Sequence, residues 1–235
     1  MSEIWFEESL VPDLDILESA SKGESSEDRP PVTVSSSVRV NIPRTRILST
    51  TEIGHMAMPT PNYKYLLVRL GCEFDPGPAA RAEHISFDSA VFQVYIHASG
   101  PEMPRVYSLA PVEFDKGKPG NVKLKLEPSL TFVSGAGGSL GGIETDLAIG
   151  RVAPVVRGFT GKDERQPYWN LESHKEFPLY GLRHFWLILE APPSTQDCYL
   201  SCRVEAFLTT ILGRLFMRPA KREIEHRPRY KITFA

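Results

Sequence analysis

The sequence predicts an all-β protein, an antiparallel β-sandwich of roughly eight to ten strands. Segments in which apolar and polar residues alternate recur along the chain, and a period of two is typical of a strand with one buried face. The chain also contains 17 glycines and 20 prolines, and both residues divide a chain into short elements. Strands do not alternate with amphipathic helices, so the folds that bind nucleotides between such units are disfavoured.

The individual strands are read from this alternation and from the turns between them. Residues Val32–Ile42 alternate throughout, and Tyr63–Phe74 ends at an Asp-Pro-Gly-Pro turn, a sequence that favours chain reversal. His184–Glu190 is apolar without alternation, as expected of a strand that is covered on both faces. The other predicted strands are Ile85–His97, Arg105–Phe114, Asn121–Leu126, Ser129–Val133, Tyr199–Leu208 and Tyr230–Phe234.

Residues 203–217 fit two structures. Their first half alternates and continues the strand that begins at Tyr199, but apolar residues also recur there at the spacing of a helical face. A short helix near 203–217 is therefore the alternative to a strand. An apolar face over residues 204–216 beside basic residues would also suit a membrane surface, which makes membrane-surface action one of the candidate functions.

Charge divides the chain into two parts. Residues 1–31 carry nine acidic and two basic residues, a net charge of −7, whereas the remainder carries +5. Ser19–Pro31 is poor in hydrophobic residues and rich in Ser, Glu and Pro, a composition that disfavours a packed core. We therefore expect residues 1–31 to form an acidic, poorly ordered N-terminal tail and residues 32–235 to form a single sandwich domain.

Aromatic residues provide the candidate binding surface. In the tail, Trp5 and Phe6 either pack on the domain itself or form a docking motif that a partner orders. Tyr168, Trp169, Phe177 and Tyr180 lie in a turn-rich segment, where they either contact a partner or close the end of the sandwich. The sequence assigns these six residues as candidate binding residues.

One glycine-rich segment suggests catalysis. Gly137–Gly141 matches the G-x-S-x-G pattern around Ser139, which in serine hydrolases presents the nucleophile at a tight strand-to-helix turn. His174 or His184 is the candidate base. The segment that follows has no helical pattern, so a plain loop explains the same glycines.

The remaining chemistry is sparse. The six histidines and three cysteines show no metal-ligand spacing, and no phosphate-binding motif is present, so we expect neither a metal nor another cofactor. Seven basic residues lie in Arg214–Lys231, but no nucleic-acid-binding motif surrounds them, and the acidic tail is a simpler partner. The N-terminus resembles no secretory signal, and the cytoplasm is the expected location.

These observations favour a non-enzymatic interaction or assembly module. Its loops and acidic tail would contact a protein partner or a second copy of the chain, and the tail would dock that partner or regulate access to the domain. The alternatives are a serine hydrolase that uses Ser139 and a protein that acts at a membrane surface through residues 204–216.

Overall fold

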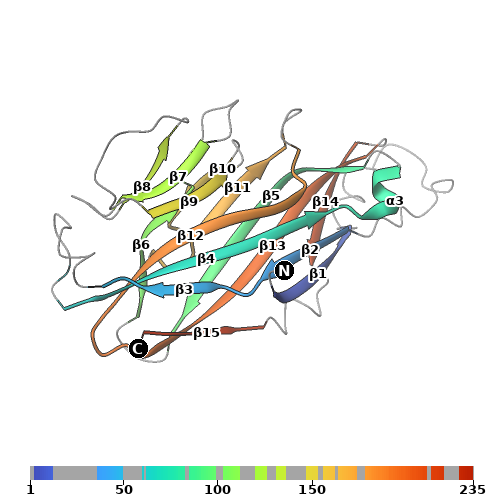
Figure 1. The fold of residues 1–235 in the computed structure, drawn as a ribbon. Helices are drawn as coiled ribbons and strands as arrows, with labels where there is room; N and C mark the ends of the chain where they lie inside the picture. The colour runs from blue at the N-terminus through green and yellow to red at the C-terminus, as the bar shows by residue number, and fades with distance from the viewer. Residues whose placement is uncertain are drawn as a thin grey trace.

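The computed structural model describes residues 3–12, 36–49, 60, 62–82, 85–98, 103–111, 120–125, 131–135, 147–152, 156–161, 164–173, 178–210, 213–219 and 228–234. Within these ranges the chain forms fifteen strands and one short helix (Figure 1). In chain order the elements are β1 (Ile4–Pro12), β2 (Ser36–Asn41), β3 (Arg44–Ile47), β4 (Lys64–Asp75), α3 (Gly77–Ala82), β5 (Ser86–His97), β6 (Arg105–Ala110), β7 (Gly120–Lys125), β8 (Thr131–Gly135), β9 (Leu147–Val152), β10 (Val156–Phe159), β11 (Tyr168–Glu172), β12 (Gly181–Ala191), β13 (Asp197–Thr210), β14 (Gly213–Pro219) and β15 (Tyr230–Thr233).

Twelve of the strands form one antiparallel sheet that folds over on itself. Its order is β10-β11-β5-β13-β14-β1-β2-β4-β12-β6, with β15 beside β13 and β3 beside β4. The two halves of the sheet meet face to face, since Phe92 on β5 and Phe185 on β12 lie with their ring centroids 4.9 Å apart. Phe74 on β4 likewise contacts Phe87 on β5, at 5.5 Å. The protein is therefore a β-sandwich, as the sequence predicts.

Alternation along the strands builds the core between the two layers. On β4, Leu66, Val68 and Leu70 are fully buried, and the residues between them face away from the core. The same holds for β13, where Val204, Ala206 and Leu208 are buried. Long, regular strands are thus specified by one apolar face each, which also fixes their register.

The other three strands, in the order β8-β7-β9, form a separate antiparallel sheet at one end of the molecule (Figure 1). Their pairing places Leu124 opposite both Phe132 and Leu147. The predicted strands at 121–126 and 129–133 lie largely in β7 and β8. The fifteen strands exceed the roughly eight to ten predicted because short strands such as β3 and β10 carry too few residues to show a period.

The strand favoured for the beginning of 203–217 is confirmed, and the alternative of a short helix is wrong. The segment forms the end of β13 and the beginning of β14, which pair as an antiparallel hairpin with Phe207 opposite Phe216. Apolar residues recur there at helical spacing because the end of one alternating strand is followed closely in the sequence by the beginning of the next. Val204 and Leu208 are buried in the sandwich, so these two side chains do not face a membrane. A membrane role for the rest of 204–216 stays a prediction.

The N-terminal segment also differs from the prediction. Ile4–Pro12 is a strand in the interior of the sheet, between β2 and β14, and Leu10 is fully buried. These residues therefore belong to the sandwich and not to a poorly ordered tail. Residues 13–31 lie outside the described residues, and the domain boundary proposed for them stays a prediction.

The Asp-Pro-Gly-Pro turn opens into the short helix α3. The carboxylate Oδ1 of Asp75 accepts a hydrogen bond from the amide of Gly77 at 2.8 Å, which is the role of a residue at a helix N-terminus. Pro78 follows in the first turn, where its missing amide hydrogen costs nothing. Among the described residues, no helix is both long enough and apolar enough to cross a bilayer.

Candidate functional site

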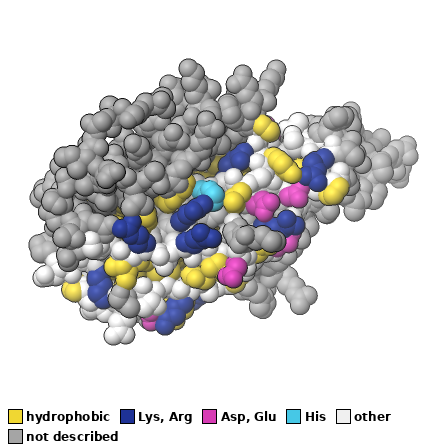
Figure 2. All heavy atoms as spheres, in the orientation of Figure 1, with side chains coloured by type: hydrophobic (Ala, Val, Ile, Leu, Met, Phe, Trp, Pro, Cys, Tyr) yellow, Lys and Arg dark blue, Asp and Glu magenta, His cyan; other side chains and the backbone are white. Residues whose placement is uncertain are grey.

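A basic cleft lies on the outer face of the layer formed by β2, β3, β4 and β12. It has a volume of about 140 Å³. The outer face of this layer carries arginine and histidine side chains because they occupy the positions of β3, β4 and β12 that alternate with the core residues. Figure 2 shows basic side chains beside a histidine on this side of the molecule. The cleft is lined by Asn41, Ile42, Arg44, Arg69, Leu70, Gly71, Leu182 and His184.

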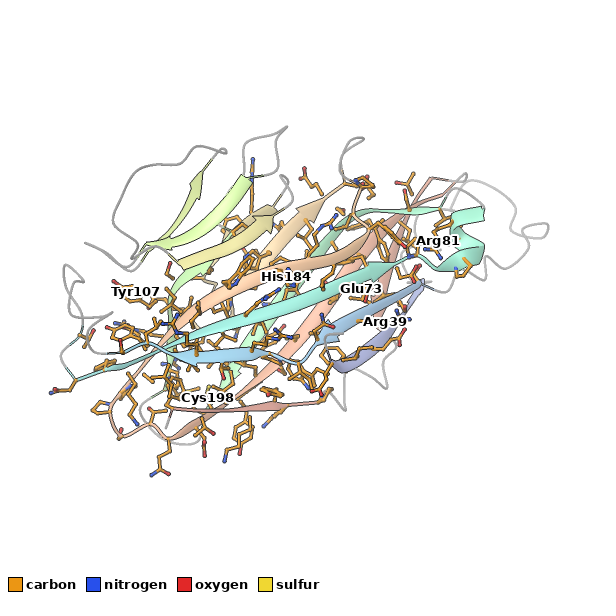
Figure 3. The ribbon with its side chains drawn as sticks, viewed as in Figure 1. Arg39, Glu73, Arg81, Tyr107, His184 and Cys198 are labelled. Atoms are coloured by element: carbon orange, nitrogen blue, oxygen red, sulfur yellow. The ribbon has the colours of Figure 1, made fainter. Side chains whose placement is uncertain are left out.

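Strand pairing brings the polar residues of the cleft together. Arg44 on β3 is directly opposite Arg69 on β4, and His184 on β12 is directly opposite Gly71 on β4. His184 lies where β12 and β4 run side by side (Figure 3). Residues at 41, 44, 69 and 184 are far apart in the sequence, and only the register of three strand pairs places them around one space.

Arg69 and His184 are joined by a hydrogen bond. A guanidinium nitrogen of Arg69 lies 2.7 Å from Nε2 of His184. Burial, followed by the positive charges of Arg69 and Arg44, lowers the pKa of His184 to about 4. The imidazole is therefore neutral near pH 7, with Nε2 as the acceptor, because a guanidinium has only donors. Burial and the charge of Arg44 also lower the pKa of Arg69.

The cleft carries positive charge without a compensating acid among the described residues. Neither Arg44 nor Arg69 makes an ion pair with a carboxylate in the part of the chain that the structure describes. Like charges directly opposite on neighbouring strands repel each other. Arg69 is also half-buried, which increases the cost of its charge. An anion in the cleft would offset both costs.

A glycine forms the floor of the cleft. A Cβ atom on Gly71 would lie 2.8 Å from Nδ2 of Asn41 and 3.2 Å from Cδ1 of Leu182. Any other residue at this position would therefore push into the cleft or displace Asn41. Leu182, whose side chain is 38% exposed, also lines the cleft.

A second polar cluster on the same face is closed by its own contacts. Glu190 is buried, and its carboxylate accepts hydrogen bonds from Arg105 and, at 3.2 Å, from the Tyr65 hydroxyl. Tyr65 packs edge-on against Tyr107 with centroids 5.5 Å apart, and burial raises the pKa of both hydroxyls. Because Glu190 and Arg105 are already paired with each other, we interpret this cluster as structural.

The predicted hydrolase residues are only partly described. Ser139 and His174 lie outside the described residues, so their proximity to a base stays untested. His184 is in the basic cleft, and the lone pair of its Nε2 is already taken by Arg69. A pKa of about 4 makes this imidazole a weak base near neutral pH. The geometry therefore gives no support to His184 as the base of a serine hydrolase.

The predicted aromatic binding residues have different surroundings. Trp169 is fully buried, stacks on Phe92 at 5.8 Å and donates a hydrogen bond from Nε1 to the carbonyl of Pro111 at 3.1 Å. It therefore closes the sandwich and does not face a partner. Tyr168 stacks on Phe159, with centroids 4.9 Å apart. Phe177 lies outside the described residues.

Tyr180 is the predicted binding residue that is most open to solvent among those described. It is 49% exposed, and its hydroxyl accepts a hydrogen bond from Arg81 at 2.8 Å. Its binding role stays a prediction.

Trp5 and Phe6 pack on the domain itself. Both are half-buried against the core cluster. The ring of Trp5 lies 5.1 Å from that of Phe6 and 5.6 Å from that of Tyr230 on β15, both edge-on. This arrangement favours the interpretation that they dock on their own domain, while a role in partner binding stays a prediction.

The sequence analysis did not find Arg44, Arg69, Asn41 or Gly71. In the sequence each of them is an ordinary polar or turn residue of a predicted strand. They come together only through the register in which the strands pair, and a single sequence does not reveal that register. Among the described residues, no group of three or more His, Cys, Asp or Glu side chains is placed to hold a metal ion.

Comparison with known proteins identifies no family for this chain. No family model matches the sequence, and no curated protein is similar to it. Among the solved structures that are similar to this chain, three have sequence identities of 8–9%. A pore forming protein is 9% identical over 89% of this chain and 97% of its own, with a TM-score of 0.44. Clostridium perfringens delta-toxin is 8% identical over 88% and 96%, with a TM-score of 0.42. The membrane-inserted form of the Clostridium perfringens NetB toxin is 8% identical over 87% and 93%, with a TM-score of 0.35.

Proposed function

We propose that this chain is a non-enzymatic binding module that holds an anionic group of its partner in the basic cleft. The observation that carries the proposal is the pair Arg44 and Arg69, which face each other across β3 and β4 without an acid among the described residues. Arginine in a partly buried position is well suited to such binding, because its planar fork of donors stays charged at all ordinary pH values.

The partner is a protein or a second copy of the chain that presents an anionic group to the outer face of β3, β4 and β12. A face of this kind favours binding of a partner over catalysis of a reaction. The cleft contains donors and a neutral imidazole, and its lining includes neither a carboxylate nor a nucleophilic side chain. Charge on the face would also steer an anionic partner toward it.

The test is a titration of the full chain with sodium sulfate and with sodium succinate at constant ionic strength, followed by NMR of the arginine side-chain Nε–Hε groups. At least one of the two anions is expected to cause a saturable shift at Arg69. The corresponding shift of the Arg44 Nε–Hε group, which also lines the cleft, should be lost in Arg69→Gln and retained in Arg229→Gln, which removes an exposed arginine outside the cleft. Shifts that do not saturate, or that are equal in both variants, would overturn the proposal.

A second candidate function is action at a membrane surface. Two of the exposed large hydrophobic side chains, Leu182 and Ile47, flank the arginines of this face, and basic residues beside exposed apolar ones favour binding to anionic lipid. Co-sedimentation with phosphatidylcholine vesicles, with and without phosphatidylserine, tests this candidate. Binding that requires phosphatidylserine and is weakened by Leu182→Ser supports it, and equal recovery from both kinds of vesicle contradicts it.

A further inference from the structure

We propose that the anionic group that the partner places in the basic cleft is a tetrahedral dianion, namely the phosphate of a phosphate monoester. The inference rests on the proposed function and narrows it from anions in general to one chemical class. Three features of the cleft support it, namely the number of polar side chains that line it, its volume and its positive charge.

The polar side chains that line the cleft come from four different strands. Arg44 on β3, Arg69 on β4 and His184 on β12 surround the cleft, and Asn41 at the end of β2 lies over its glycine floor. A carboxylate is planar and offers two oxygens, which one arginine can satisfy with two parallel hydrogen bonds. Arg44, Arg69 and Asn41 offer donors from three strands around one cleft, which suits an anion with three or four oxygens in a tetrahedral arrangement.

The cleft is large enough for a phosphate group. Its volume is about 140 Å³, and one water molecule in the liquid takes up about 30 Å³. Because the cleft is open to solvent, the substituent of the ester can extend out of it. Leu182, whose side chain is 38% exposed, lines the cleft and offers that substituent an apolar contact.

The positive charge of the cleft favours a bound group with two negative charges over one with a single negative charge. Two guanidiniums face each other across β3 and β4, so a dianion leaves neither of them uncompensated. The charged groups that act on His184 from the neighbouring strands are Arg69 and Arg44. A bound dianion would offset their repulsion and would therefore raise the pKa of His184 from its value of about 4.

The test is isothermal titration calorimetry of the full chain at about pH 7.5, where methyl phosphate is a dianion. The probes are methyl phosphate, sulfate, acetate and succinate at equal ionic strength. Methyl phosphate and sulfate are expected to compete for one site and to bind at least about tenfold more tightly than either carboxylate. If succinate binds as tightly as methyl phosphate, the inference fails while the proposed function stands. If none of the probes binds, both fail.

Two variants tie the binding to the cleft. Arg69→Gln removes one donor and is expected to weaken methyl phosphate binding by more than about tenfold. Gly71→Ala leaves every charge in place but fills the floor, and it should weaken binding to a similar degree. Arg229→Gln is the control that should bind as the original chain does. Circular dichroism of each variant shows that it is folded, and full binding by folded Gly71→Ala would overturn the inference.

A further pair of measurements separates the two sources of a phosphate monoester. Phosphatidic acid in phosphatidylcholine vesicles presents the group on a lipid, and methyl phosphate presents it in solution. If methyl phosphate displaces the chain from these vesicles, the lipid headgroup is a ligand of the cleft. If the chain binds methyl phosphate but not the vesicles, the ligand is soluble. The inference is contradicted if the chain binds these vesicles, does not bind methyl phosphate in solution, and is not displaced from the vesicles by methyl phosphate.

Discussion

Arg69 on β4 donates a hydrogen bond to Nε2 of His184 on β12, at 2.7 Å. The contact fixes the proton of the neutral imidazole on Nδ1, since a guanidinium cannot accept a hydrogen bond. The same hydrogen bond holds the Arg69 side chain over the pair of strands β4 and β12. In the pairing of β3 with β4, Arg44 lies directly opposite Arg69. The charge state of the cleft therefore depends on this pair, and several of its consequences can be measured.

The first prediction concerns acid stability. The pKa of His184 is lowered to about 4 by burial and by Arg69 and Arg44, whereas it is about 6.5 in the unfolded chain. Between these values the unfolded chain binds more protons than the folded one, so stability falls as the pH falls from about 6.5 to about 4. We expect a loss of about 1–3 kcal/mol from this residue, discounted for its partial exposure.

Urea unfolding of the original chain and of His184→Gln, at about pH 7.5 and about pH 4.5, checks this value. The variant should lose less stability on acidification than the original chain. Part of the pH dependence should persist, because burial and Arg229 also lower the pKa of His97. An equal loss in both proteins would contradict the assignment to His184.

The second prediction concerns the closed polar cluster. Glu190→Gln removes the buried negative charge that Arg105 and Tyr65 contact, and leaves the arginine without its best partner. Since Arg105 is half-exposed, we expect a loss of about 2–4 kcal/mol in the free energy of unfolding. Glu164 also pairs with Arg105, at 3.5 Å, but both side chains are about half exposed. Glu164→Gln is therefore the matched control and should cost less than about 1 kcal/mol.

The fold could be predicted further than the site. The longest patterned segments predicted β4, β5 and β13, and the continuous apolar run at His184–Glu190 predicted β12, because burial of one or both faces of a strand is visible in its sequence. The strand β1 was missed because its acidic residues resemble a solvated tail. One of them, Glu7, pairs with Arg39 on β2 at 3.1 Å, and that long-range contact leaves no local signal.

The site depends on register, and register depends on tertiary structure. Arg44 and Arg69 are ordinary outward-facing residues until β3 and β4 pair and place them opposite each other. His184 was singled out from the sequence for a different chemistry, as a catalytic base. Its surroundings, two arginines and a glycine floor, come from two other strands and change the interpretation.

The third prediction tests how the sandwich closes between β10 and β6. A Cβ atom on Gly158 would lie 2.3 Å from the carbonyl oxygen of Pro111 and 2.9 Å from Nε1 of Trp169. Gly158→Ala should therefore force the edges apart and cost about 1–3 kcal/mol or more. Gly181 has a positive φ of 75° and open space around it, so Gly181→Ala should cost only about 1 kcal/mol through backbone strain. Thermal unfolding of both variants compares them, and the reverse order would contradict this account.

The fourth prediction tests whether β1 is part of the folded domain. Leu10 is fully buried in the core cluster, so Leu10→Ala should lower the free energy of unfolding by about 2–5 kcal/mol. Ile4 on the same strand is 51% exposed, and Ile4→Ala should change stability by less than about 0.5 kcal/mol. Chemical denaturation measures both. A Leu10→Ala variant as stable as the original would return this segment to the poorly ordered tail that its composition suggests.

The fifth prediction concerns the cysteines. Cys72, Cys198 and Cys202 form no disulfide, and all three are buried. Burial, with a smaller contribution from Asp197, raises the pKa of Cys198 to about 12. Because the thiolate is the reactive form, this thiol should resist alkylation in the folded protein. Iodoacetamide at about pH 8, followed by peptide mass spectrometry, should label Cys198 only as fast as the protein unfolds. Adding urea should then accelerate its labelling to the rate of a free thiol. Rapid labelling in the absence of denaturant would mean that β13 opens locally and that its pairing with β15 is weaker than the structure implies.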